Sequence, residues 1–180
     1  MIKNTSHAYI FQETEVSIVF YNLAKYFRSR TVIKEKLWVR IGYHIMGLVN
    51  LTRMHHCSII FSRGENSVVL MTSRTHRAKF IDEKRFHEIY YSPSKTINLG
   101  KAMVSLQQLN EYIKEPPYVG NLPSLMLWYF IIKPLLVLKS LQPKTCSLLI
   151  SNMLRLCGYN VTDCVTPKRL HKELNKLCNL

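Results

Sequence analysis

The chain has 180 residues, of which 47% are hydrophobic and 20% are charged. This length and composition fit one compact domain with a buried core, and no repeat or low-complexity segment interrupts it. The 25 Lys and Arg residues against 11 Asp and Glu give a net charge of +14, which favours contact with nucleic acid, anionic lipid or an acidic protein. The basic residues are scattered and no nucleic-acid-binding motif accompanies them, so the charge alone does not identify the partner.

The cysteines indicate a reducing compartment. There are five, an odd number, and their spacing is not that of a disulfide framework: Cys57, Cys146, Cys157, Cys164 and Cys178. Residues 1–14 are polar and contain no apolar segment, so we expect no secretory signal and a location in the cytoplasm or a virion. No Cys-x-x-Cys or paired-His spacing is present, and we therefore expect neither a metal nor a cofactor.

The first 34 residues are expected to form an N-terminal arm and a basic amphipathic helix. Residues 1–12 are polar with scattered aromatics. Residues 13–30 place apolar side chains at helical spacing and basic side chains on the other face; the apolar set is Val16, Val19, Phe20, Leu23 and Phe27. The remainder, residues 35–180, is expected to form one α+β domain.

A small antiparallel sheet is predicted next. Residues 57–62 and 67–72 are rich in strand-forming side chains, and the turn at residues 63–66 joins them into a hairpin. Residues 77–81 fit a third strand, followed by a short helix or turn at residues 82–88.

Two apolar segments follow. Residues 97–114 predict a helix that ends before Pro116. Residues 124–141 are the most apolar stretch, but Lys133-Pro134 interrupts it, whereas a membrane span needs about 20 uninterrupted apolar residues. We predict a kinked helix that is buried or docked on the surface; the alternative is a loop that makes peripheral contact with a membrane.

A cysteine opens the helix predicted next. Residues 146–157 form an amphipathic pattern that starts with Cys146 and ends at Gly158. A thiol at a helix start faces unpaired backbone N–H groups and the positive end of the helix dipole, and both favour the thiolate that attacks carbonyls. The final predicted helix, residues 167–177, has Thr166 as its N-cap and Pro167 at its first position.

A thiolate becomes a catalyst when a histidine exchanges its proton and a polar group orients the imidazole. His55 and His56, where the first hairpin strand begins, are the candidate partners of Cys146. The structural alternative is equally simple, because a cysteine before Leu-Leu-Ile is often a small core residue and histidines at a strand end are often surface groups.

An ordered set of features resembles a known family. A histidine opens a hairpin strand after Thr52-Arg53, a loop with Pro117-Tyr118 and an apolar stretch follow, and Thr145-Cys146-Ser147 opens a helix. The last helix has the pattern Thr-Pro-x-x-Leu-x-x-x-Leu, formed by Thr166, Pro167, Leu170 and Leu174. Over residues 38–177 this order resembles the circularly permuted branch of the NlpC-like papain-fold cysteine hydrolases, in the variant often carried by bacteriophages.

The resemblance implies a papain-like α+β fold, in which a small antiparallel sheet packs on the helix that bears the nucleophile and further helices surround them. It makes Cys146 the nucleophile and His56 the base. The family commonly has a Glu, His or similar polar residue on the second strand, and here the orienting group would be a hydroxyl, which stabilises an imidazolium less than a carboxylate does. The residues implied for orientation or substrate binding are Thr72, Ser73, His76, His55 and Tyr118.

Three functions remain open at this point. The first is a thiol hydrolase that cleaves a peptide, a cell-wall peptide or a related acyl bond. The second is a weakly active or inactive virion protein on the same fold, which docks on other virion subunits or nucleic acid through its basic surface. The third is a lipid-handling acyltransferase, in which residues 124–141 would bind an acyl chain or contact a membrane.

Overall fold

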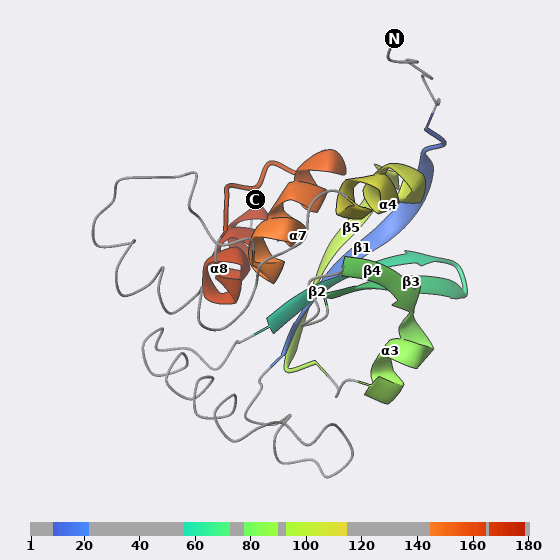
Figure 1. The fold of residues 1–180 in the computed structure, drawn as a ribbon. Helices are drawn as coiled ribbons and strands as arrows, with labels where there is room; N and C mark the ends of the chain where they lie inside the picture. Colours follow the sequence, from blue (N-terminus) through green and yellow to red (C-terminus); the bar gives the residue numbers. More distant parts are fainter. Residues whose placement is uncertain are drawn as a thin grey trace.

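The structure is a computed structural model, and it describes residues 9–21, 56–72, 78–89, 93–114, 145–164 and 166–178. These residues form an α+β fold in which a five-stranded antiparallel sheet has the strand order β4-β3-β2-β1-β5. The strands are β1 Gln12–Tyr21, β2 His56–Arg63, β3 Asn66–Thr72, β4 Ala78–Asp82 and β5 Lys95–Val104. Strand β2 therefore lies in the middle of the sheet (Figure 1).

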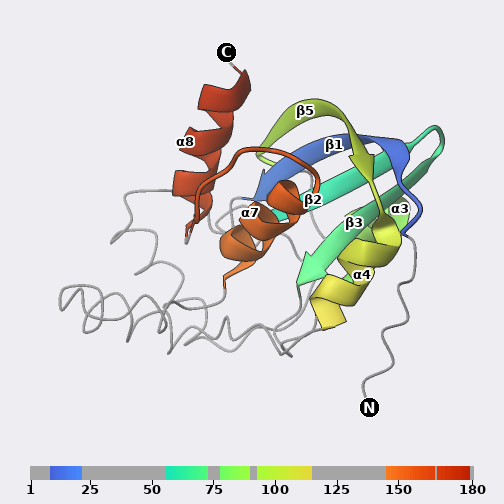
Figure 2. The same ribbon diagram turned by 90° about the horizontal axis from the view of Figure 1, so that it is seen from above.

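Four helices are described, and they cover both faces of the sheet (Figure 1). Helices α4 (Leu106–Lys114), α7 (Cys146–Leu156) and α8 (Pro167–Cys178) pack on one face through the larger core cluster. Helix α3 (Glu83–Ile89) lies on the other face, where Phe86 packs in a smaller cluster. Figure 2 shows α7 between α8 and α4, over the central strands.

The sequence prediction of the hairpin is confirmed. Strands β2 and β3 pair from Arg63↔Asn66 to Ile60↔Val69, and Gly64 turns between them at a φ of 59°. A positive φ costs glycine nothing because it has no Cβ, which explains the glycine in this tight turn. The third strand and the short helix after it also form, as β4 and α3.

The predicted helix at residues 13–30 is wrong where the structure describes it, because Gln12–Tyr21 is strand β1. The strand pairs with both β2 and β5, and from Ile18 to Tyr21 its side chains pack on both faces of the sheet. A strand that is covered on both faces has a continuous apolar run, whose periodicity cannot be distinguished from that of a buried helix. The chain before residue 34 thus contributes a strand to the sheet core; the proposed boundary at residue 34 lies outside the described residues.

The predicted helix at residues 97–114 is wrong in its first half. Lys95–Val104 forms strand β5, and the helix begins only at Leu106, after Ser105 accepts a hydrogen bond from the Gln108 N–H (3.4 Å). In this strand Met103 is 57% exposed, whereas Ile97 and Val104 supply the buried contacts.

The last two helices form as predicted. At the end of α7, Gly158 has a φ of 88°, and the N–H groups of Gly158 and Tyr159 bond the carbonyls of Arg155 (3.0 Å) and Leu154 (2.9 Å). This pair of bonds is a Schellman ending, which requires a residue that adopts a positive φ. In α8 the Thr166 hydroxyl accepts from the Arg169 N–H (3.2 Å).

The prediction of a kinked helix at residues 124–141 lies outside the described residues. Within the part of the chain that the structure describes, no helix is long and apolar enough to cross a membrane.

The position of β1 inside the sheet, between β2 and β5, gives a direct test of the fold. Ile18 is fully buried, so Ile18→Ala should lower the free energy of unfolding by about 2–5 kcal/mol, through lost apolar burial and the cavity left behind. Ile10→Ala is the matched control, because Ile10 is 70% exposed and should cost far less. Urea unfolding of both variants measures the difference, and equal stabilities would contradict a buried central β1.

Candidate active site

The candidate site lies at the end of the sheet where β2 begins. Its first residue is His56, and the antiparallel neighbours β1 and β3 end there at Tyr21 and Thr72. Helix α7 packs on β2 and brings its first residue, Cys146, to the same place. The Sγ atoms of Cys57 and Cys146 lie 3.8 Å apart.

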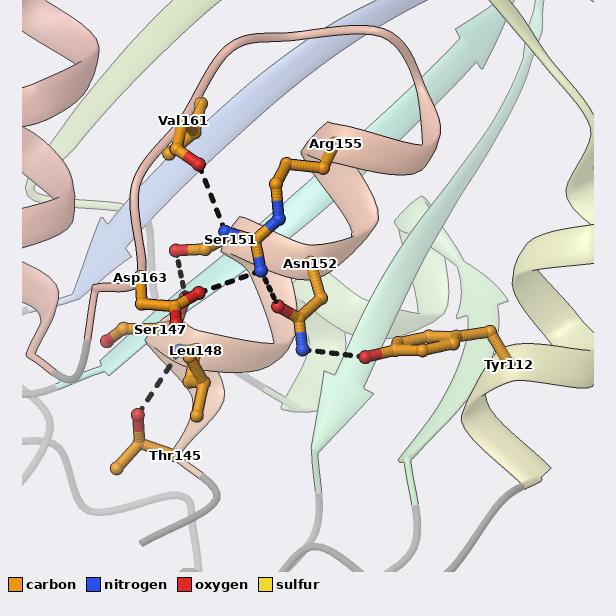
Figure 3. A network of polar contacts seen from close by, with 9 residues as sticks. All are labelled: Tyr112, Thr145, Ser147, Leu148, Ser151, Asn152, Arg155, Val161 and Asp163. Atoms are coloured by element: carbon orange, nitrogen blue, oxygen red, sulfur yellow. Dashed lines mark hydrogen bonds and ion pairs between the residues drawn. The ribbon is translucent and has the colours of Figure 1, made fainter. Parts of the chain in front are cut away.

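The cap of α7 fixes Cys146 as the first helical residue. Thr145 is extended (φ −91°, ψ 163°), and its Oγ1 accepts a hydrogen bond from the Leu148 N–H (3.2 Å), as Figure 3 shows. Thr145 is buried, so its hydroxyl makes this bond away from solvent. The first N–H groups of a helix have no partner within the helix, so a sulfur at this position meets the positive end of the helix dipole.

Side-chain contacts along α7 hold the helix in place (Figure 3). Arg155 pairs with Asp163 (2.8 Å), donates to the Val161 carbonyl (3.0 Å) and bonds the Asn152 side chain, which fastens the chain after the helix back onto it. Asn152 in turn donates to the Tyr112 hydroxyl of α4 (2.6 Å). The position of Cys146 is therefore set by contacts at both ends of its helix.

The surroundings of Cys146 lower its pKa well below the ordinary value. The main cause is a hydrogen bond that the Cys57 thiol donates to the Cys146 sulfur. The charge of His56, a hydrogen bond from its side chain and the Cys57 backbone N–H act in the same direction, while burial opposes them. A lowered pKa favours the thiolate form of Cys146 over the thiol.

Cys57 behaves in the opposite way. Burial raises its pKa well above the ordinary value, and the hydrogen bond to Cys146 and the charge there raise it further. Its sulfur also lies 3.6 Å from the Ser147 hydroxyl oxygen. Only one thiol of such a close pair ionises readily, and the half-buried Cys146 at the helix start is the one with stabilising neighbours.

Of the first two predicted site residues, Cys146 begins α7 and His56 begins β2, and the charge and a side-chain hydrogen bond of His56 contribute to the lowered pKa of Cys146. Thr72 ends β3 at the same end of the sheet, but strand alternation places it on the face of Leu70, whereas His56 shares the other face with Ile60. The remaining candidates, Ser73, His76, His55 and Tyr118, lie outside the described residues and stay predictions.

Two residues of the site were missed or undervalued by the sequence prediction. Tyr21 pairs directly with His56 across β1 and β2, with ring centroids 6.1 Å apart, and its ring also lies 5.8 Å from that of Phe86. Tyr21 thus lies beside the imidazole on the same face of the sheet, where a group that orients the ring is needed. Tyr21 could not be predicted as a site residue, because its segment was predicted as a helix. Cys57 could have been proposed, because it is next to His56 in the sequence.

The described residues contain no group of three or more His, Cys, Asp or Glu side chains that could hold a metal ion. The chemistry available to them is that of a thiolate beside an imidazole and a helix start, which suits nucleophilic attack on a carbonyl.

No protein-family model matches the chain, and comparisons with curated proteins and with solved structures give no significant match.

The lowered pKa predicts a pH profile of alkylation. A thiol reacts with iodoacetamide as its thiolate, so Cys146 should stay reactive at pH values below the usual cysteine pKa of about 8.5. Cys57→Ala removes the hydrogen-bond donor and His56→Ala the positive charge, and each should move the midpoint to higher pH.

Mass spectrometry of the Cys146 peptide follows the reaction. Cys57→Ser is the matched control, because its hydroxyl still donates and should move the midpoint less than Cys57→Ala does. The exposed Cys178 is an internal control in every sample. A Cys146 midpoint that none of the three substitutions moves would contradict the described electrostatics.

Proposed function

We propose that the chain is a thiol hydrolase that cleaves an amide or related acyl bond through Cys146 and His56. The observation that carries the proposal is the placement of Cys146 as the first residue of α7, with its sulfur 3.8 Å from the Cys57 thiol and its pKa lowered by Cys57 and His56. A cysteine that only fills space in the core requires neither a hydrogen-bond donor nor a positive charge beside its sulfur. Cys157 provides the contrast, because burial raises its pKa to about 12.

In the proposed reaction the Cys146 thiolate attacks the carbonyl carbon of the substrate. The oxyanion that forms would accept a hydrogen bond from the Cys146 backbone N–H in the first turn of α7. His56 gives a proton to the leaving amine, and the carbon–nitrogen bond breaks to leave an acyl group on sulfur. Water, deprotonated by His56, then attacks the thioester, releases the acid and restores the thiolate.

Tyr21 takes part in this proposal as a positioning residue for the imidazole. Its ring lies against His56 and is itself buried between β1 and α3, so it limits the orientations of the histidine. This contact gives the site a third member from β1, in place of a polar group on the second strand. A ring contact restrains the imidazole, but it supplies no negative charge to stabilise the imidazolium.

The architecture proposed with this function is papain-like, of the permuted NlpC type. The supporting observations are a histidine at the start of a central strand, a helix that begins with the cysteine and packs on that strand, and the order of the two along the chain. The proposed substrates are peptides and cell-wall peptides. Acyl transfer to a lipid shares the first chemical step and differs only in the group that receives the acyl chain.

An activated ester tests the proposal. With p-nitrophenyl acetate, the wild-type chain should release nitrophenol and gain one acetyl group on Cys146, and Cys146→Ala should gain none there. His56→Ala should slow acylation by about 10²- to 10⁴-fold, the usual contribution of a positioned acid–base group. Stopped-flow absorbance gives the rate, and intact-mass and peptide measurements locate the acetyl group.

The exposed Cys178 supplies the control, because Cys178→Ala should acylate at the wild-type rate. Equal acylation of wild type and Cys146→Ala would refute the proposal, since another thiol would then be responsible. Loss of the acetyl group to water supports a hydrolase, and transfer only to an added amine or alcohol acceptor would redirect the proposal to an acyltransferase.

A further inference from the structure

The second cysteine of the site has no step in the proposed hydrolysis. Cys57 is 1% exposed, and its Sγ lies 3.8 Å from Cys146 Sγ, across the contact between β2 and α7. Two sulfurs at this separation need to approach by less than 2 Å to reach the disulfide bond length of about 2.05 Å. The elements that hold them are the central strand of the sheet and a helix fixed at both ends.

We propose that Cys146 and Cys57 form an oxidation site, in which a hydroperoxide oxidises Cys146 and Cys57 captures the product as a reversible disulfide. The inference rests on the proposed function only in using the same Cys146 sulfur as the reacting atom. It assigns Cys57 a role of its own, namely to protect the site from irreversible oxidation.

Access separates the roles of the two thiols. Cys146 is half-buried, whereas Cys57 is buried. A hydroperoxide from solution therefore meets Cys146 first. Oxidation follows accessible thiolates, and Cys146 has the charge-stabilising neighbours. The buried Cys57 stays a protonated thiol that reacts only with a group brought to it.

The two steps balance without any further reagent. In the first, Cys146 sulfur attacks one oxygen of the hydroperoxide, the O–O bond breaks, and with one proton from solvent the products are a sulfenic acid and an alcohol, or water when the oxidant is hydrogen peroxide. In the second, Cys57 sulfur attacks the sulfenic sulfur, the S–O bond breaks, and the hydroxyl leaves as water with the Cys57 proton. A dithiol reductant reverses the result.

Burial is the main cause of the raised pKa of Cys57, and the first step removes the further contribution of Cys146. The charge on Cys146 and the hydrogen bond to it contribute to the raised pKa of Cys57, and both are lost when Cys146 becomes a neutral sulfenic acid. Capture should then outrun a second oxidation, because the attacking sulfur is already in contact, whereas sulfinic acid requires another hydroperoxide molecule to arrive.

Cys164 is the competitor to consider. It is buried, and its charge would also raise the pKa of Cys57, so it belongs to the same part of the core. The test therefore has to map the disulfide to its two cysteines rather than detect oxidation alone.

The experiment treats the full-length chain with hydrogen peroxide at neutral pH and follows its mass. Wild type should lose two hydrogen atoms, yield a Cys57–Cys146 linked peptide, and regain iodoacetamide labelling of Cys146 after dithiothreitol. Cys57→Ser should instead accumulate sulfinic or sulfonic acid on Cys146, with labelling that dithiothreitol does not restore. Cys164→Ser should behave as wild type.

Cys57→Ala is the second variant, and circular dichroism shows whether each variant is folded before oxidation. A disulfide that maps to Cys164, or labelling of Cys146 in both folded Cys57 variants that recovers as fully as in wild type, would overturn the proposal. The readout is separate from hydrolysis. A linked peptide without any acylation of Cys146 would leave this inference standing and remove the hydrolase, and acylation without a linked peptide would do the reverse.

Discussion

The contact between the start of α7 and the start of β2 is the constraint on which the site depends. It places the first residue of the helix against the second residue of the strand, so that Cys146 meets the Cys57 thiol at 3.8 Å. The Thr145 cap and the Arg155 contacts fix this end and the opposite end of the helix. Since a thiolate needs donors held at fixed positions, the packing of one helix on one strand produces the electrostatics of the whole site.

The sheet supplies the remaining geometry. Because β1 and β2 are antiparallel neighbours, the residue that ends β1 pairs with the residue that begins β2. This places Tyr21 beside His56 on one face, and the ring of Phe86 in α3 packs against that of Tyr21. The same alternation sends Cys57 to the opposite face, toward α7. One strand thus presents a histidine and a cysteine in sequence, and neighbours on both faces give each residue a different environment.

Local signals predicted much of this arrangement, and pairings distant in the sequence were the ones that could not be predicted. Thr145, Gly158 and the Thr166-Pro167 pair act within a turn of their own helices, so the ends of α7 and α8 follow from sequence. The hairpin follows from its turn. Strands β1 and β5 were mistaken for helices because their partners lie far along the chain. In β1, burial on both faces also removes the alternation. Tyr21 was missed for the same reason, whereas Cys146 and His56 were proposed from their positions at the start of a helix and of a strand.

The central claim is that Cys57 and His56 lower the pKa of Cys146 well below that of an ordinary cysteine. The ultraviolet absorbance of the thiolate measures this directly, as the difference between the folded chain and its Cys146→Ser variant during a pH titration. The account predicts thiolate absorbance that appears at lower pH than for an ordinary cysteine and moves to higher pH in the folded His56→Ala, Cys57→Ala double variant. The account would be contradicted if the Cys146 absorbance appeared only in the alkaline range of an ordinary cysteine, in the wild-type chain as in the double variant.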